Sequence, residues 1–200
     1  MDVLVVNHSQ VHQLLPMNEC IELMERALRA AAEGRYGTPP RTVVRLPGGK
    51  GVLGMMPSFA TDLKIMGLKV VSVFPGNAGT EYDSHQGAIM LFETDHGRPL
   101  AIVDAGAVTA IRTPAVSALA TRLLAREDAS EVALLGSGIQ AYGHLEALLH
   151  VRPIRRATVW SVPAAHARQF AVAAADRFRI PVEAVATSRE AVERADIICT

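Results

Sequence analysis

The sequence has no excess of charge of either sign, because 20 Lys and Arg residues balance 20 Asp and Glu residues among 200. A basic surface for nucleic acid or for an anionic membrane is therefore not indicated. The sequence also lacks the ~18 consecutive apolar residues of a membrane-spanning helix, and its start lacks the charged and apolar regions of a secretory signal. These absences predict a cytoplasmic protein with a small-molecule partner, and neither a nucleic-acid nor a membrane partner.

Cysteine and several catalytic motifs are also scarce or missing. The two cysteines, Cys20 and Cys199, are far apart and fall in unrelated predicted elements, so reduced thiols are expected rather than a disulfide. No GxSxG elbow and no P-loop lysine occur, which gives hydrolase and NTPase functions little support. The seven histidines form no convincing metal-ligand set, so no metal is expected.

The first half of the chain is typical of an α+β domain. Hydrophobic residues make up 50% of the sequence, which is enough for a substantial core. Apolar positions recur at helical spacing from Met17 to about Glu33 and predict an amphipathic helix. Short β-like runs separated by turn residues follow at 42–46, 52–56, 65–74, 88–93 and 100–104. Because these runs do not alternate with helices, they predict a mainly antiparallel sheet in a separate domain, residues 1–112.

The second half predicts a parallel sheet. A helical pattern from 107 to about 126 is interrupted at Thr113-Pro114, where we expect a kink or a restart with Thr113 as N-cap. Strands and helices then alternate regularly. The strands are expected at 132–135, 157–160, 182–185 and 196–199, and the helices at 139–149, 164–178 and 189–194. This alternation predicts a Rossmann-type α/β domain over 113–200, and because such a domain has about six strands, we expect the sequence to be a fragment.

The stretch EVALLGSGIQA, residues 131–141, carries the most specific local pattern. A short apolar strand breaks into Gly136 and Gly138, and a helix begins directly afterwards. Gly136 permits a tight turn, Gly138 allows the backbone to approach a pyrophosphate, and Ala141 keeps the helix close to the sheet. The phosphates would lie at the helix N-terminus, where unpaired N–H groups attract anions. The pattern predicts a dinucleotide site, although such a glycine turn can also be merely structural.

Three cations are candidate ligands for a substrate carboxylate. Lys69 lies within the apolar run GLKVVSVF, where a buried charge must be paired or functional; alternatively the strand is half exposed and Lys69 points to water. Arg112 has apolar neighbours and can bind both oxygens of a carboxylate, or it forms a structural salt bridge. Arg45 and Arg41 together could simply cover the solvent face of a strand.

Three segments, in this order, resemble the ornithine cyclodeaminase/mu-crystallin family: GLKVVSVFPGN, AIVDAGAVTAIRTPAVSALATRLLA and VALLGSGIQA. The resemblance covers nearly the whole chain. It implies a substrate and dimerisation domain followed by a Rossmann domain, a homodimer, and hydride transfer between a nicotinamide and the α-carbon of an amino acid or imine. Family members are typically longer than this chain, and the acidic residue that assists proton transfer is expected beyond Thr200.

Residue by residue, the resemblance assigns the substrate carboxylate to Arg45, Lys69 and Arg112, and Lys69 is also the candidate for proton transfer. Thr113 matches a residue on the cofactor phosphates. The remaining residues expected at the cofactor are Gly136, Ser137, Gly138, Ile139, Gln140 and Ser161.

The chain departs from the family pattern at two places. Ornithine cyclodeaminases carry an acidic residue shortly before a Met-Pro pair, whereas this sequence reads Gly54-Met55-Met56-Pro57. Without that carboxylate a distal ammonium would be poorly compensated, which favours a small, apolar or cyclic substrate. The second predicted Rossmann strand ends at Ser161 rather than at the Asp or Glu usual in NAD enzymes. The cofactor is therefore NAD or NADP, with NADP slightly favoured because His166 or Arg168 could reach a 2′-phosphate.

Three functions follow as hypotheses. The first is an NAD(P)-dependent oxidoreductase acting on the C–N bond of a small L-amino acid or cyclic ketimine. The second is a lyase of the ornithine cyclodeaminase type that forms proline and ammonia. The third is an NADPH-bound protein without turnover, like mu-crystallin.

Overall fold

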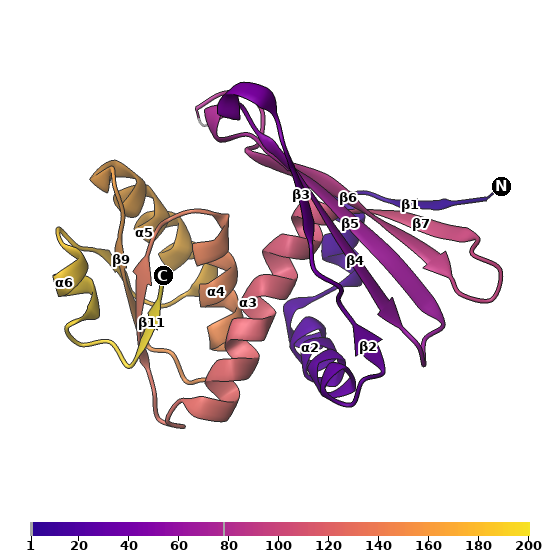
Figure 1. The fold of residues 1–200 in the computed structure, drawn as a ribbon. Helices are drawn as coiled ribbons and strands as arrows, with labels where there is room; N and C mark the ends of the chain where they lie inside the picture. The colour runs from indigo at the N-terminus through magenta and orange to yellow at the C-terminus, as the bar shows by residue number, and fades with distance from the viewer. Residues whose placement is uncertain (1, 78) are drawn as a thin grey trace. The chain divides into compact units, whose positions relative to one another are not determined.

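The computed structural model describes residues 2–77 and 79–200 and divides the chain into two compact units (Figure 1). The first unit is Met1–Pro16 with Arg26–Thr109, and the second is Met17–Glu25 with Ala110–Thr200. Helix α2, Met17–Ala32, therefore contributes residues to both units, whereas the two predicted domains are continuous in sequence. That the units are a substrate domain and a cofactor domain stays a prediction.

The first unit is built on a seven-stranded sheet in the order β1-β7-β6-β5-β4-β2, with β3 also paired to β4. Its strands are β1 Leu4–Val6, β2 Tyr36–Gly37, β3 Thr42–Arg45, β4 Val52–Ala60, β5 Ile65–Val73, β6 His85–Glu93 and β7 Pro99–Asp104. Every pairing is antiparallel except that of β1 with β7. The mainly antiparallel sheet is thus confirmed, whereas the short strands β1 and β2 were not predicted.

Two α-helices and two short 3-10 turns connect strands of this sheet. They are α1 His8–Leu14, α2 Met17–Ala32 and two 3-10 turns, η1 Pro47–Gly49 and η2 Pro75–Asn77. The side chain of Asn7 accepts a hydrogen bond from the Gln10 backbone N–H, while Gln10 accepts one from the Asn7 backbone N–H. This capping box fixes the start of α1, a helix too short to be evident from periodicity.

The register separates the sheet into two faces. Lys69 on β5 lies opposite Met56 on β4 and Ile89 on β6. Because alternate residues of a strand share a face, this lysine face also carries Gly54 and, on β3, Arg45. The other side is the apolar face, defined here by Val5, Val44, Leu53, Phe59 and Met66, each at least 38% exposed.

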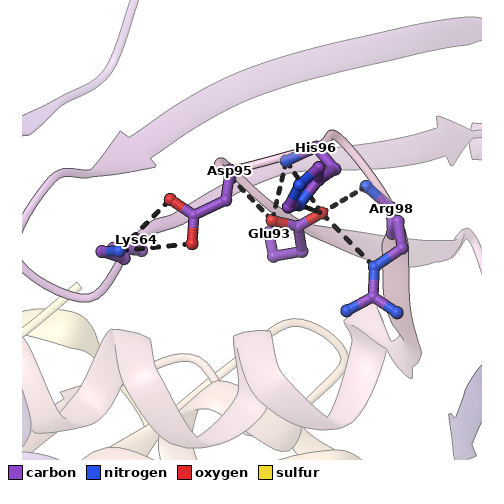
Figure 2. Close-up of polar contacts among 5 residues, drawn as sticks. All are labelled: Lys64, Glu93, Asp95, His96 and Arg98. Carbon is purple, nitrogen blue, oxygen red and sulfur yellow. Dashed lines mark hydrogen bonds and ion pairs between the residues drawn. The ribbon is translucent and has the colours of Figure 1, made fainter.

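The turn between β6 and β7 is organised around a carboxylate, as Figure 2 shows. The backbone N–H groups of Asp95, His96 and Arg98 all donate to the Glu93 carboxylate, at 2.7 to 3.1 Å. These bonds stabilise the charged form and lower the pKa of Glu93 to about 2. Lys64 Nζ lies 3.2 Å from both carboxylate oxygens of Asp95, which ties this turn to the turn between β4 and β5.

The second unit contains a four-stranded parallel sheet in the order β10-β9-β8-β11. Its strands are β8 Glu131–Leu135, β9 Arg156–Trp160, β10 Val182–Ala184 and β11 Ile197–Cys199. Its helices are α3 Ala105–Leu124, α4 Ile139–Leu149, α5 Ala164–Phe178 and α6 Ser188–Val192. The first turn of α3 belongs to the first unit. Numbered along the chain, the strands run 3-2-1-4, which is the order of a doubly wound dinucleotide-binding sheet. The Rossmann-type α/β prediction is confirmed.

The core of the second unit lies between this sheet and the helices α4 and α5. Leu145 and Leu148 of α4 and Phe170 of α5 are almost fully buried against Val132 and Val159 of the sheet.

Both cysteines are free, and burial raises the pKa of Cys199 to about 11. No helix in the described ranges is both long enough and apolar enough to cross a membrane.

Helix α3 differs from its prediction, because it runs unbroken through Pro114. Thr113 is therefore not an N-cap, and the helix does not restart there. Pro114 deprives the Ala110 carbonyl of its helical donor, but Pro114, Ala115 and Ala118 are all fully buried. Packing thus stabilises helical geometry that local preference disfavours.

Candidate functional site

The glycine turn after β8 has a backbone geometry that requires glycine. Gly136 has a φ of 134°, which L side chains rarely adopt, and its N–H donates to the Trp160 carbonyl at 2.8 Å. This bond joins the end of β8 to the end of β9. A Cβ added at Gly136 or Gly138 would have no atom within 4 Å, so the space beside the turn is open.

The start of α4 fits an anionic group. Gly138 is the N-cap and supplies no side-chain acceptor to the first turn. The first N–H groups of a helix have no partner within the helix, and together they favour negative charge. An open turn in front of such a terminus can accept a pyrophosphate, with Ile139 and Gln140 in the first helical turn. Ile139 is exposed, and Gln140 is half-buried.

Two serines connect the glycine turn to the end of β9. Ser137 Oγ lies 2.9 Å from Ser161 Oγ, and Ser161 is only 9% exposed. The structure thus brings Ser161 together with the predicted turn, although 24 residues separate the two serines. No carboxylate occupies position 161, where an NAD enzyme usually offers one to the ribose hydroxyls.

A hollow of about 420 Å³ adjoins this turn. It is lined by Ser137, Gly138, Tyr142, His166, Gln169, Phe170 and Ala173. Of the two cations suggested for a 2′-phosphate, His166 therefore lies beside the glycine turn, whereas Arg168 does not line the hollow.

Lys69 is half-buried on the lysine face, and its Nζ donates to the hydroxyl of Thr109. Thr109 in turn donates to the Ala105 carbonyl at 2.6 Å. The ammonium is therefore held against the start of α3 rather than directed only into water. Its cross-strand neighbours, Met56 and Ile89, are apolar, so a small ligand beside Lys69 would meet one cation and an apolar wall.

Arg45 shares the lysine face but is exposed and not adjacent to Lys69. The register separates the two residues by two strands and four positions, roughly 17 Å at the usual strand spacings. Arg112 lies in the second unit and is exposed on α3. Within residues 2–77 and 79–200 it forms no ion pair with a carboxylate. Its charge opposes the upward shift that burial gives the pKa of Cys20.

Thr113 is half-buried on α3, and its surroundings include two residues that the sequence did not single out. Ser117 Oγ lies 2.9 Å from His144 Nε2, and His144 Nδ1 lies 2.8 Å from the Gln140 carbonyl oxygen. These contacts join α3 to the first turn of α4. The sequence contains one indication of their role: Ser117 follows Thr113, and His144 follows Gln140, by four positions, which is about one helical turn.

In the described part of the chain, no three His, Cys, Asp or Glu residues gather so as to hold a metal ion.

A glycine turn between the first strand and first helix of a parallel sheet, combined with a separate α+β unit, defines a Rossmann-type protein with an additional domain. The chain belongs to the ornithine cyclodeaminase/mu-crystallin family, whose profile matches residues 1–200. The family resemblance of the sequence is thereby confirmed.

Two of the relatives are named as reductases. A Δ1-pyrroline-2-carboxylate reductase of Bacillus cereus is 35% identical over 198 residues, covering 99% of this chain and 61% of the relative. Ketimine reductase mu-crystallin of Mus musculus is 33% identical over 180 residues, covering 88% of this chain and 56% of the relative. The chain thus spans about three fifths of the length of these relatives.

Solved structures show the same relationship. The Thermococcus litoralis Δ1-pyrroline-2-carboxylate reductase, in complex with NADH and L-proline, superposes with a TM-score of 0.93 at 34% identity, covering 98% of this chain and 61% of that one. An archaeal alanine dehydrogenase dimer with bound NAD gives a TM-score of 0.90 at 31% identity, covering 99% of this chain and 60% of that one.

Proposed function

We propose that the protein containing this chain is an NAD(P)-dependent oxidoreductase that reduces the C=N bond of a cyclic imine carboxylate, the class to which Δ1-pyrroline-2-carboxylate belongs. The observation that carries this proposal is the environment of Lys69, a half-buried cation flanked by the apolar Met56 and Ile89. Such a site suits a carboxylate attached to an apolar ring. The two reductase relatives, and the proline and NADH bound to one of the solved structures, support the same class of substrate.

The proposed chemistry balances with one hydride and one proton. When bound, NADH or NADPH would supply a hydride to the carbon of the C=N bond. In this proposal Lys69 binds the carboxylate and orients that carbon, and the family resemblance adds Arg45 and Arg112 as further ligands. The nitrogen gains a proton, for which Lys69 is the nearest donor among our candidates. The reverse reaction would oxidise a small L-amino acid.

The proposed cofactor site consists of Thr113, the turn Gly136 to Gln140, and Ser161. The open space beside Gly136 and Gly138 and the uncapped start of α4 support this assignment. The absence of a carboxylate at Ser161 removes repulsion toward a 2′-phosphate, and His166 beside the turn offers a partner for it. We therefore propose that NADPH is accepted at least as well as NADH, which a comparison of kcat/KM for the two cofactors would measure.

The register argues against a substrate with a distal ammonium. Gly54 and Met56 share the face of Lys69, and neither carries a charge. A carboxylate that could hold an amine is therefore missing from this stretch of β4, and the ornithine cyclodeaminase reaction is correspondingly disfavoured. Incubation with ornithine and catalytic NAD⁺ tests this directly, because only the lyase forms proline and ammonia without net NADH.

The deciding experiment measures reduction of Δ1-pyrroline-2-carboxylate by the protein as the cell makes it, followed through consumption of NADH or NADPH. We expect turnover, and we expect Lys69→Ala to lower kcat/KM by about 10²- to 10⁴-fold, because it removes both a charge partner and a proton donor. Lys50→Ala is the matched control, since Lys50 is exposed, and should leave kcat/KM unchanged. Cofactor binding without turnover of any imine would instead indicate a binding protein that is not an enzyme, and unchanged activity of Lys69→Ala would contradict the assigned role.

We also propose that the protein is a homodimer and that the apolar face of the first unit forms its interface. Val5, Val44, Leu53, Phe59 and Met66 lie on four strands of one sheet and are all exposed. Exposed apolar side chains on one face of a sheet favour an interaction site, and a two-fold axis would bury the same face on both protomers. The archaeal alanine dehydrogenase relative is described as a dimer.

A further inference from the structure

Helices α3 and α4 of the second unit approach each other unusually closely. A Cβ added at Gly143 would lie 2.6 Å from Pro114 Cγ and 3.0 Å from the Ala110 carbonyl oxygen. Ala110 is the residue whose helical hydrogen bond Pro114 removes. The two helices thus pack closely where Gly143 has no side chain and Pro114 has no N–H.

Beside this contact, a hydrogen-bonded chain runs between the two helices. A carbonyl oxygen can only accept, so His144 Nδ1 must donate to the Gln140 carbonyl at 2.8 Å. In the neutral imidazole, Nε2 of His144 is then an acceptor, and the Ser117 hydroxyl donates to it at 2.9 Å. The Thr113 carbonyl, at 3.5 Å from Ser117 Oγ, is the more distant of the two acceptors available to that hydroxyl.

The ends of this chain coincide with the proposed cofactor site. Gln140 lies in the first turn of α4, directly after the glycine turn, and Thr113 lies one helical turn before Ser117 on α3. His144 holds the Gln140 carbonyl, while Ser117 fixes His144 to the other helix. A shift of α4 relative to α3 would therefore move Gln140 relative to Thr113 and would break the bond between Ser117 and His144.

We infer that Ser117 and His144 are positioning residues that fix the first turn of α4 against α3 for binding of the cofactor phosphates. This inference rests on the proposed function, because it assumes that Thr113 and the turn Gly136 to Gln140 hold a dinucleotide. Neither residue needs to touch the cofactor. Their effect is to hold in advance the geometry that binding would otherwise have to impose.

The test is the dissociation constant of NADH and NADPH for the protein as the cell makes it, measured by fluorescence titration, together with the melting temperature. Ser117→Ala removes the hydroxyl and should weaken binding of both cofactors about tenfold, the order of magnitude of one net hydrogen bond. Ser117→Thr keeps the hydroxyl and should restore most of the affinity.

Thr158→Val is the matched control. Thr158 donates to the Ala191 carbonyl at 2.8 Å between β9 and α6, so this substitution also deletes one hydroxyl hydrogen bond in the same unit. It should lower the melting temperature without changing cofactor affinity. If Ser117→Ala and Thr158→Val weaken cofactor binding equally, Ser117 contributes only to general stability, and the inference is overturned.

Two further outcomes separate the inference from the proposed function. If the unaltered protein binds neither NADH nor NADPH, the proposed function fails. If it binds them and Ser117→Ala binds equally well, only the positioning inference fails. Nitrogen NMR of His144 in the unaltered protein gives a check that needs no variant: the Nδ1–H tautomer is expected, and the Nε2–H tautomer would contradict the hydrogen-bonded chain.

Discussion

At the scale of single residues, two charged side chains are held by uncharged groups of the protein. Three backbone N–H groups hold the Glu93 carboxylate, and the Thr109 hydroxyl holds the Lys69 ammonium. The two charged groups have different roles in the molecule. Glu93 closes a turn between two strands, whereas Lys69 lies on the sheet face where we place the substrate.

Glu93 gives a prediction about pH. Its pKa in the folded protein is about 2, below the usual 4.5, so its contribution to stability is present above pH 4.5 and is lost as the pH falls toward 2. Glu93→Gln should therefore lower the free energy of unfolding at neutral pH, and the difference from the unaltered protein should shrink progressively below pH 4.5. Urea unfolding across this pH range measures it, and NMR titration of the carboxyl should give a value near 2.

The control for this prediction is Glu127→Gln, which neutralises an exposed carboxylate whose side chain has no hydrogen bond within the described ranges. Its effect on unfolding should be small and nearly independent of pH. A destabilisation by Glu93→Gln that stays constant from neutral pH to pH 2 would show that the three N–H donors do not favour the charged form.

At the scale of elements, α3 and α4 show how packing decides helix geometry. Local preference places a helix start at Thr113-Pro114, but burial of Pro114 and its neighbours keeps α3 continuous. Gly143 is poor for helix propensity, yet the close approach of α3 leaves no space for a Cβ. Pro114 and Gly143 each disfavour the helix that contains them, and their presence is accounted for by packing against the other helix.

Gly143→Ala should accordingly destabilise the protein by about 1 to 2 kcal/mol, because overpacking against the rigid Pro114 ring exceeds the gain in helix propensity. Chemical denaturation would measure this difference. Gly76→Ala is the control, since a Cβ there meets nothing within 4 Å and the φ angle is not positive. A stabilised Gly143→Ala variant would mean that the two helices can separate without loss.

At the scale of the whole molecule, the sheet of the first unit has two faces with different chemistry. One carries Lys69 and Arg45, and the other is apolar and exposed. The alternation of side chains along β3, β4 and β5 assigns the candidate substrate ligands to one face and the proposed dimer contact to the other. A protein of this kind can dimerise without covering its substrate ligands.

The dimer proposal predicts the effect of charge on the apolar face. Leu53→Lys combined with Met66→Lys should convert the protein to a monomer, because two unpaired ammonium groups would be buried on each side of the interface. Sedimentation equilibrium measures the mass. Val172→Lys, at an exposed position on α5, should leave the mass unchanged. A monomeric unaltered protein, or a double variant that remains dimeric, would refute this interface.

The sequence by itself determined most of the longer helices and strands, the parallel and antiparallel sheets, the glycine turn and the family. These follow from periodicity and from local backbone requirements such as the positive φ of Gly136, which neighbouring residues encode directly. Only the tertiary structure decided that α3 continues through Pro114, that Ser161 meets Ser137, and that Ser117 and His144 join two helices. Those contacts depend on residues 24 or more positions apart, and packing free energy between elements outweighs the local preferences from which the sequence was interpreted.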